Sequence, residues 1–126
     1  MSTDFKASKG IFEQIADTLA HRILDGSLKA GDRVPSVRDL AEEFEVNRNT
    51  LLRTYALLND AGIIDNRRGV GFFVSDDAVE RIRTREKAAF FEDMLPAFME
   101  KVSLLRLTAD ELQSLIQLIE KNTTQA

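Results

Sequence analysis

The chain's 126 residues give room for one compact domain with a modest extension, and not for two domains with independent cores. The hydrophobic fraction of 44% and the charged fraction of 30% are typical of a globular protein and exclude an intrinsically disordered one. The sequence has no cysteine for a disulfide or a thiolate metal site, and no apolar run long enough to span a membrane. Since the stretch from Met1 to Lys9 also lacks the apolar core of a signal peptide, we expect a cytoplasmic protein.

The formal net charge of −4 does not by itself indicate a protein that binds nucleic acid. The charges are unevenly distributed, however. Residues 46–75 carry Arg48, Arg53, Arg67 and Arg68 against only two aspartates, whereas the chain from residue 76 onward has a surplus of acids. Because phosphate contacts depend on a local basic patch, the sequence allows a DNA footprint, and we expect it to be small.

The first part of the chain predicts three helices. Apolar residues recur at steps of three and four from about Ile11 to Asp25, and a glycine follows. A second, short helix is expected from Pro35-Ser36 to about residue 44, with the Ser36 hydroxyl as its N-cap. A third helix is expected from about residue 48 to 61, with Asn47 as its N-cap and a glycine as its stop.

The next segment predicts a β-hairpin. Two β-prone runs, residues 63–68 and 72–74, flank the turn Gly69-Val70-Gly71. Another short strand is expected at Arg33-Val34. The order helix, short strand, helix, tight turn, helix and hairpin is that of a winged helix-turn-helix.

A helical pattern resumes from about Asp77. Pro96 interrupts it and removes a backbone hydrogen bond to the carbonyl of Glu92, so we expect a kink or a short break there. Thr108 and Glu111 are spaced as a capping box for a last helix. The predicted fold is therefore mainly α with a small β-hairpin: a winged helix-turn-helix over residues 8–75, followed by a short all-helical dimerisation tail over residues 76–123.

The third helix carries the residues suited to reading DNA. In a helix-turn-helix the second helix of the pair lies in the major groove, and its first turn faces the base edges. Here it opens with Asn47-Arg48-Asn49-Thr50. Arginine can bind guanine O6 and N7 with two hydrogen bonds, asparagine can pair similarly with adenine, and the helix N-terminus adds amides that attract phosphates.

Leu52 falls on the same face of that helix as Arg48, Asn49 and Arg53. Two interpretations are open. The leucine either packs against the second helix, as a structural residue, or contacts the methyl group of a thymine.

Five spaced motifs between Ile11 and Val74 point to a known family. They are Ile11-Phe12-Glu13-Gln14-Ile15, Ile23-Leu24-Asp25-Gly26, Gly31-Asp32-Arg33-Val34-Pro35-Ser36-Val37-Arg38-Asp39-Leu40-Ala41, Asn47-Arg48-Asn49-Thr50 and Gly69-Val70-Gly71. In these motifs the span resembles the DNA-binding domain of the GntR family of bacterial regulators. It departs from the family at Leu52, where many relatives carry a polar or basic residue.

The resemblance implies roles for individual residues. Ser36 and Arg38 would hold phosphates, while Arg48, Asn49 and Thr50 would approach bases and backbone. At the wing, Gly69 would let the tip lie close to the minor groove, and Arg67 and Arg68 would neutralise the strand beside it. Structural alternatives stay open: Arg38 as a surface helix residue, the two wing arginines as a solvated hairpin, and Gly69 and Gly71 as turn residues alone.

The tail resembles that of the YtrA-like branch of the family, in which a short helical segment serves dimerisation. Only about 50 residues follow Val74, and their apolar faces are too many for two or three short helices to bury alone. A second copy is the simplest partner. The expected dimerisation residues are Phe90, Phe91, Leu95, Phe98, Met99, Leu112, Leu115, Ile116 and Ile119.

The sequence thus predicts a transcriptional regulator, a repressor more than an activator, that binds double-stranded DNA as a homodimer on two half-sites. No nucleophile–base pair, phosphate loop or metal-ligand spacing is visible, and His21 stands alone, so we expect neither an enzyme nor a cofactor nor a metal. The alternative is a winged helix that serves as a protein-interaction adaptor without DNA. Whether an unidentified small-molecule effector binds where apolar faces of the tail and the DNA-binding domain meet is left open.

Overall fold

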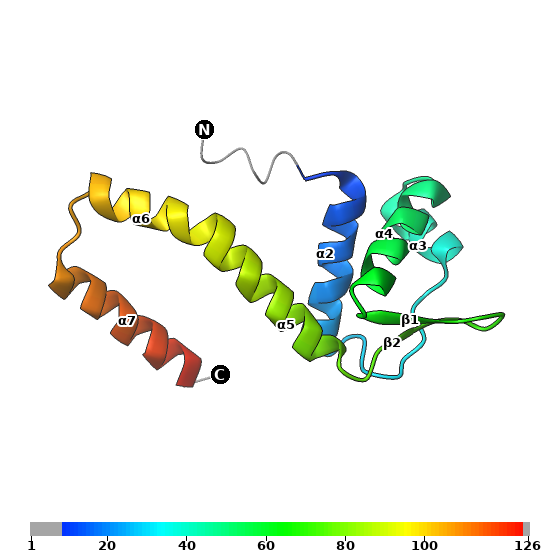
Figure 1. Cartoon of the computed structure of the whole chain (residues 1–126). Helices are drawn as coiled ribbons and strands as arrows, with labels where there is room; N and C mark the ends of the chain where they lie inside the picture. Colours follow the sequence, from blue (N-terminus) through cyan, green and yellow to red (C-terminus); the bar gives the residue numbers. More distant parts are fainter. Residues whose placement is uncertain (1–8, 125–126) are drawn as a thin grey trace. The chain divides into compact units, whose positions relative to one another are not determined.

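The computed structural model describes residues 9–124, which fall into two compact units that divide between Ala88 and Ala89. The first unit contains three helices, a hairpin and most of a fourth helix (Figure 1). These elements are α2 (Ile11–Leu24), α3 (Val37–Phe44), α4 (Arg48–Asp60), β1 (Ile64–Arg67), β2 (Gly71–Val74) and α5 (Ala78–Ala89). The predicted helices and hairpin are confirmed, with ends that differ by a residue or two.

The core of the first unit is built around α4. This helix packs against α2, α3 and β1, and its inner face buries Leu51, Tyr55 and Leu58. The Tyr55 ring meets the ring of Phe72, from β2, edge to face at 5.1 Å. One helix therefore connects the helical part of the core to the hairpin.

The predicted helix caps are present. The Ser36 hydroxyl accepts a hydrogen bond from the Asp39 amide at 3.0 Å, and Asn47 Oδ1 accepts one from the Thr50 amide at 3.0 Å. Gly62, which follows α4, has φ +76°, and a Cβ there would lie 2.9 Å from the Arg81 guanidinium. This stop thus requires glycine for its backbone conformation and for space.

The hairpin pairs β1 and β2 antiparallel, from Ile64 opposite Val74 to Arg67 opposite Gly71. Arg33 forms an isolated antiparallel bridge to Phe73, where the sequence predicted a short strand. The connection between α2 and α3 is thereby hydrogen-bonded to β2. This holds the start of α3 beside the base of the wing.

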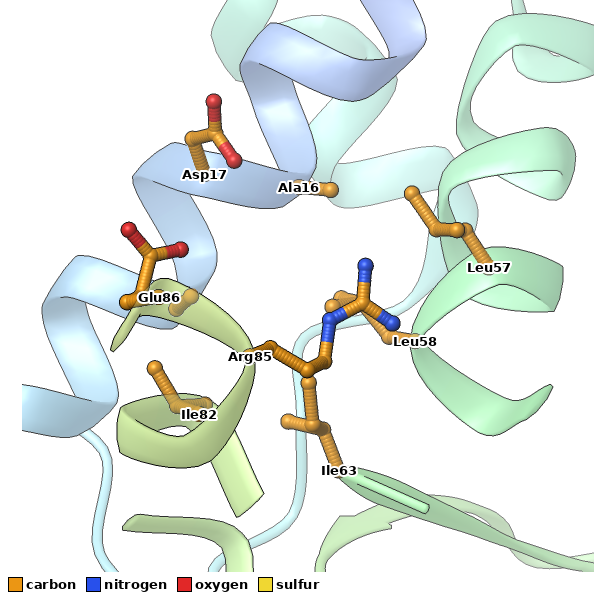
Figure 2. A pocket seen from close by; sticks show the side chains of 9 residues that line it. Ala16, Asp17, Leu57, Leu58, Ile63, Ile82, Arg85 and Glu86 are labelled. Atoms are coloured by element: carbon orange, nitrogen blue, oxygen red, sulfur yellow. The ribbon is translucent and has the colours of Figure 1, made fainter. Parts of the chain in front are cut away.

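The helix α5 begins in the core of the first unit. Ala78 and Ile82, four residues apart on one face, are both buried there. The sequence placed the tail from residue 76 onward, whereas the structure groups residues 76–88 with the winged helix because this face packs on its core. One turn later Arg85 and Glu86 line the rim of a shallow hollow against α2 and α4, beside Asp17 (Figure 2).

The described part of the second unit contains a π-helical turn η1 (Phe90–Met94), α6 (Leu95–Leu104) and α7 (Ala109–Thr124), with a non-helical connection over residues 105–108. The irregularity expected at Pro96 takes the form of this π-helical turn just before it, in which the Leu95 amide donates to the Phe90 carbonyl. Proline has no backbone N–H to donate, and the wider turn before it changes the hydrogen-bond pattern at the place where that donor is missing. The capping box is confirmed: Thr108 and Glu111 exchange hydrogen bonds of 2.9 and 3.2 Å.

Within residues 9–124 no helix has both the length and the hydropathy that a transbilayer segment requires.

The core packing predicts a large difference between two neighbouring leucines of α4. Leu51 is 0% exposed and Leu52 is 54% exposed. Leu51→Ala should lower the free energy of unfolding by about 2–5 kcal/mol, whereas Leu52→Ala should change it by roughly 0.5 kcal/mol or less. Urea denaturation followed by circular dichroism measures both, and equal losses would contradict the assignment of Leu51 to the core.

Candidate nucleic-acid interface

The first turn of α4 presents polar and basic side chains to solvent. Arg48 and Asn49 are exposed, and Thr50 is half-buried beside the Asn47 cap. Asn47 Oδ1 accepts from both the amide and the hydroxyl of Thr50. The cap occupies the Thr50 amide, and the Arg48 and Asn49 amides before it lie at the positive end of the helix dipole, where an anion is favoured.

Two buried hydrogen bonds fix the rotation of α4 about its own axis. On one side the Thr54 hydroxyl donates to the Phe12 carbonyl of α2 at 2.7 Å. On the other side the Tyr55 hydroxyl donates to the carbonyl of Pro35, which precedes the Ser36 cap of α3. Burial, with a smaller contribution from nearby Asp39, raises the pKa of the Tyr55 phenol far above its ordinary value, so the hydroxyl stays protonated and keeps donating. The exposed face of α4 therefore has one defined orientation.

Two of the arginines expected at the interface stack on aromatic rings. The Arg53 guanidinium lies 4.1 Å from the centre of the Phe12 ring, and that of Arg67 lies 4.0 Å from the centre of the Phe73 ring. Both side chains remain exposed, so stacking directs each cation while leaving N–H groups free to donate. Because Phe12 belongs to α2, this stacking places the Arg53 guanidinium on the α2 side of α4.

The start of α3 and the wing lie on the side of α4 opposite the stacked Arg53, where Tyr55 bonds to Pro35. Ser36 and Arg38 are exposed at the start of α3, as are Arg68 and Gly69 at the tip of the wing. Gly69 adopts φ +77°, which suits the tight turn, and it adds no side chain at the middle of the turn. The expected phosphate-binding residues thus all have solvent access.

Arg33 is a cation that sequence reasoning missed. It is exposed, and a Cβ at Gly71 would lie 3.1 Å from its Nε, so the guanidinium lies beside the end of the hairpin next to the turn. The signal was its position in the strand predicted at Arg33-Val34, since alternate residues of a strand next to the wing must face solvent. It extends the basic surface between α3 and the hairpin.

Leu52 is 54% exposed, so more than half of its surface is open to solvent. This exposure leaves the side chain accessible to a ligand of this surface. Ala56, one turn further along α4, is exposed as well. The stripe Arg48, Leu52 and Ala56, spaced by four residues, is therefore a basic residue followed by two apolar ones.

The second unit exposes a large apolar surface. Of the residues expected at a dimer contact, Leu95 and Leu112 are half-buried and the others are exposed. The exposed large apolar residues of this unit are Phe90, Phe91, Met94, Phe98, Met99, Leu104, Leu105, Leu115, Ile116, Leu118 and Ile119. This unit does not bury its own apolar faces.

His21 is exposed on α2. Among residues 9–124 no group of three or more histidine, aspartate or glutamate side chains is placed to hold a metal ion.

The structure has the features of a winged helix-turn-helix DNA-binding domain. The start of the short helix α3 is held beside a hairpin, and the first turn of the following helix, α4, is basic and exposed. Residues 11–74 match the family model of the bacterial regulatory proteins of the gntR family. The chain belongs to the GntR family and is a transcriptional regulator with a DNA-binding helix-turn-helix.

The relatives support this assignment and are regulators, not enzymes. The chain is 37% identical over 112 residues to an uncharacterised regulator, YhcF of Bacillus subtilis, covering 89% of this chain and 91% of the relative. It is 40% identical over 75 residues to the repressor YtrA of the same organism, covering 60% of this chain and 58% of the relative.

Solved structures resemble this one over nearly its whole length. A GntR-family regulator of Bacteroides thetaiotaomicron has a TM-score of 0.77 and 31% identity, covering 90% of this chain and 99% of that one. The GntR-family transcription factor YtrA of Sulfolobus acidocaldarius has a TM-score of 0.50 and 28% identity, covering 93% of each chain. The chain is similar to YtrA-like regulators in its helical tail as well as in its winged helix.

Two substitutions of Asn47 separate its capping role from the effect of a negative charge at the start of α4. Asn47→Ala removes the acceptor for the Thr50 amide and should lower the free energy of unfolding by about 1 kcal/mol. Asn47→Asp keeps that acceptor and should preserve stability, while its negative charge should weaken DNA binding. Thermal denaturation compares the two variants. The control is Asn49→Ala, at the second residue of α4. A loss as large in Asn49→Ala as in Asn47→Ala would contradict the capping role.

Proposed function

We propose that the protein is a sequence-specific repressor that binds a roughly palindromic operator as a homodimer. The observation that carries the proposal is the exposed Arg48 and Asn49 at the open end of a helix whose rotation Thr54 and Tyr55 fix. A reading helix must present its donors at one angle, and buried hydrogen bonds supply that rigidity. The protein would act on the chromosome in the cytoplasm.

In this proposal the first turn of α4 reads bases in the major groove. Arg48 donates to guanine O6 and N7, and Asn49 pairs with adenine N6 and N7. Thr50 binds the backbone. Asn47 contributes through its cap, which leaves its side-chain amide N–H groups free to donate to a phosphate.

The other basic residues hold the phosphates on both sides of the groove. Ser36 and Arg38 bind the backbone at the start of α3, where the hydroxyl that accepts from Asp39 still has its own proton to donate. Arg53, stacked on Phe12, binds a phosphate on the α2 side. At the wing, Gly69 approaches the minor groove while Arg67 and Arg68 neutralise the adjacent strand. Such contacts fix the register of the protein on the duplex.

The tails of two chains form the dimer. Exposed apolar residues in the second unit come from η1, α6 and α7 alike, and such a surface on a lone chain would favour aggregation. A second copy offers the same surface, so each copy covers the other. The two reading helices then address half-sites about one helical turn apart, and linking the contacts raises the affinity.

Repression requires only that a promoter be occupied. The relative named YtrA in Bacillus subtilis is a repressor, which supports this sign of regulation. A helix that docks a protein more often presents exposed aromatic residues, and the exposed face of α4 carries none. The surface therefore favours DNA over the adaptor alternative.

The first experiment enriches a binding duplex from a randomised pool with the full chain and then measures binding by fluorescence anisotropy. Arg48→Ala should weaken binding to the enriched duplex by roughly 1–3 kcal/mol and relax the preference at one base pair in each half-site. Arg83→Ala, which removes an equal charge from α5, is the control and should leave the preference unchanged. Equal weakening on enriched and shuffled duplexes would show that Arg48 does not read a base.

The dimer contact is tested at Phe98, which is 43% exposed on α6. Phe98→Asp places a charge in the proposed contact and should give monomers by light scattering at concentrations where the wild type is dimeric. Its operator affinity should fall, whereas the unfolding of the winged helix should change little because the residue lies outside that core. Phe98→Leu should remain dimeric. A Phe98→Asp protein that is still a dimer would remove this residue from the interface.

A further inference from the structure

Leu52 occupies the reading surface without any group that can form a hydrogen bond. It is 54% exposed, four residues after Arg48 and three after Asn49, and so lies on the same face as these two base-reading candidates. The exposed half of this side chain buries no apolar surface within the described fold. Its position instead points to a role in contact with the ligand of this surface.

The anchoring of α4 tells which side of the helix Leu52 occupies. Tyr55, three residues later on the adjoining surface, donates to Pro35 next to α3, whereas Arg53 turns to the opposite side and stacks on Phe12 of α2. Leu52 therefore lies on the side of the start of α3 and the wing, where the proposed phosphate contacts are. The neighbouring cation is directed away from it.

We propose that Leu52 contacts the 5-methyl group of a thymine in each half-site of the operator. In the major groove only thymine presents a methyl group at its edge. Against guanine, adenine or cytosine the leucine would strip water from donors or acceptors and offer none in return, which is unfavourable. Leu52 thus favours thymine for two reasons: its side chain is attracted to the methyl group, and it is disfavoured against the polar edges of the other bases. This inference rests on the proposed DNA-binding function.

The geometry also places the thymine relative to the base that Arg48 reads. Residues four apart on a helix are separated by about 6 Å along its axis. Successive bases of one strand are separated by about 3.4 Å along the duplex axis. The thymine therefore lies within about two base pairs of the guanine bound by Arg48. Exposed Ala56 follows at the same spacing and continues the apolar stripe.

Replacement of thymine by deoxyuridine tests the contact, since it removes only the methyl group and leaves the base edge otherwise unchanged. The probe is the duplex enriched from a random pool by the wild-type chain, with each thymine replaced in turn in both half-sites. One replacement should weaken wild-type binding about fourfold per half-site, or about fifteenfold for both. That position should lie within about two base pairs of the one whose preference Arg48→Ala relaxes.

The protein side of the test uses Leu52→Ala, an exposed position at which the fold tolerates truncation. This variant should bind the thymine duplex more weakly than the wild type and should not distinguish thymine from deoxyuridine. Leu52→Met keeps an apolar side chain and should keep the distinction. Leu24→Ala, which truncates another exposed leucine on α2, is the matched control and should keep the full ratio.

A wild type that is insensitive to every replacement, or a Leu52→Ala protein that retains the wild-type ratio, would overturn the inference and leave the proposed function standing. If the wild type enriches no duplex, the proposed function fails first and this inference with it. The two failures are therefore distinct.

Discussion

The rest of the structure depends on how α4 is held. The same helix supplies the inner wall of the core, through Leu51, Tyr55 and Leu58, and the outer face that carries Arg48 and Asn49. Two side-chain hydrogen bonds, from Thr54 to α2 and from Tyr55 to Pro35 in the connection that leads into α3, link it to both neighbours. Because one wall of the helix is buried and bonded on both edges, the opposite wall has a single orientation. The exposed donors therefore need no rearrangement to meet a groove.

The fold could be predicted from sequence where local chemistry decides the structure. Ser36 and Asn47 are good N-caps, and a glycine with positive φ ends both α2 and α4, so the helix ends followed from the residue types. The hairpin followed from its β-prone runs. The capping box at Thr108 followed from its spacing to Glu111.

Features that depend on tertiary contacts could not be predicted. The π-helical turn before Pro96 is one of several ways to accommodate a proline, and the sequence predicted an irregularity there without its form. The packing of Ala78 and Ile82 on the first unit was not visible in their periodicity, which only places them on one face. At the candidate site the residue types were predictable. The stacking of Arg53 on Phe12, the exposure of Leu52 and the position of Arg33 beside the hairpin required the structure.

The most direct measurement of the central claim is the affinity of the full chain for its enriched duplex and for a shuffled duplex over a range of salt concentrations. If α4 reads bases while the surrounding cations hold phosphates, the enriched duplex should bind more tightly by a factor of about 10³ or more. Both affinities should fall steeply as salt rises, because neutralised phosphates release counterions. Equal, weak binding of both duplexes by the full chain would contradict sequence-specific reading by this surface.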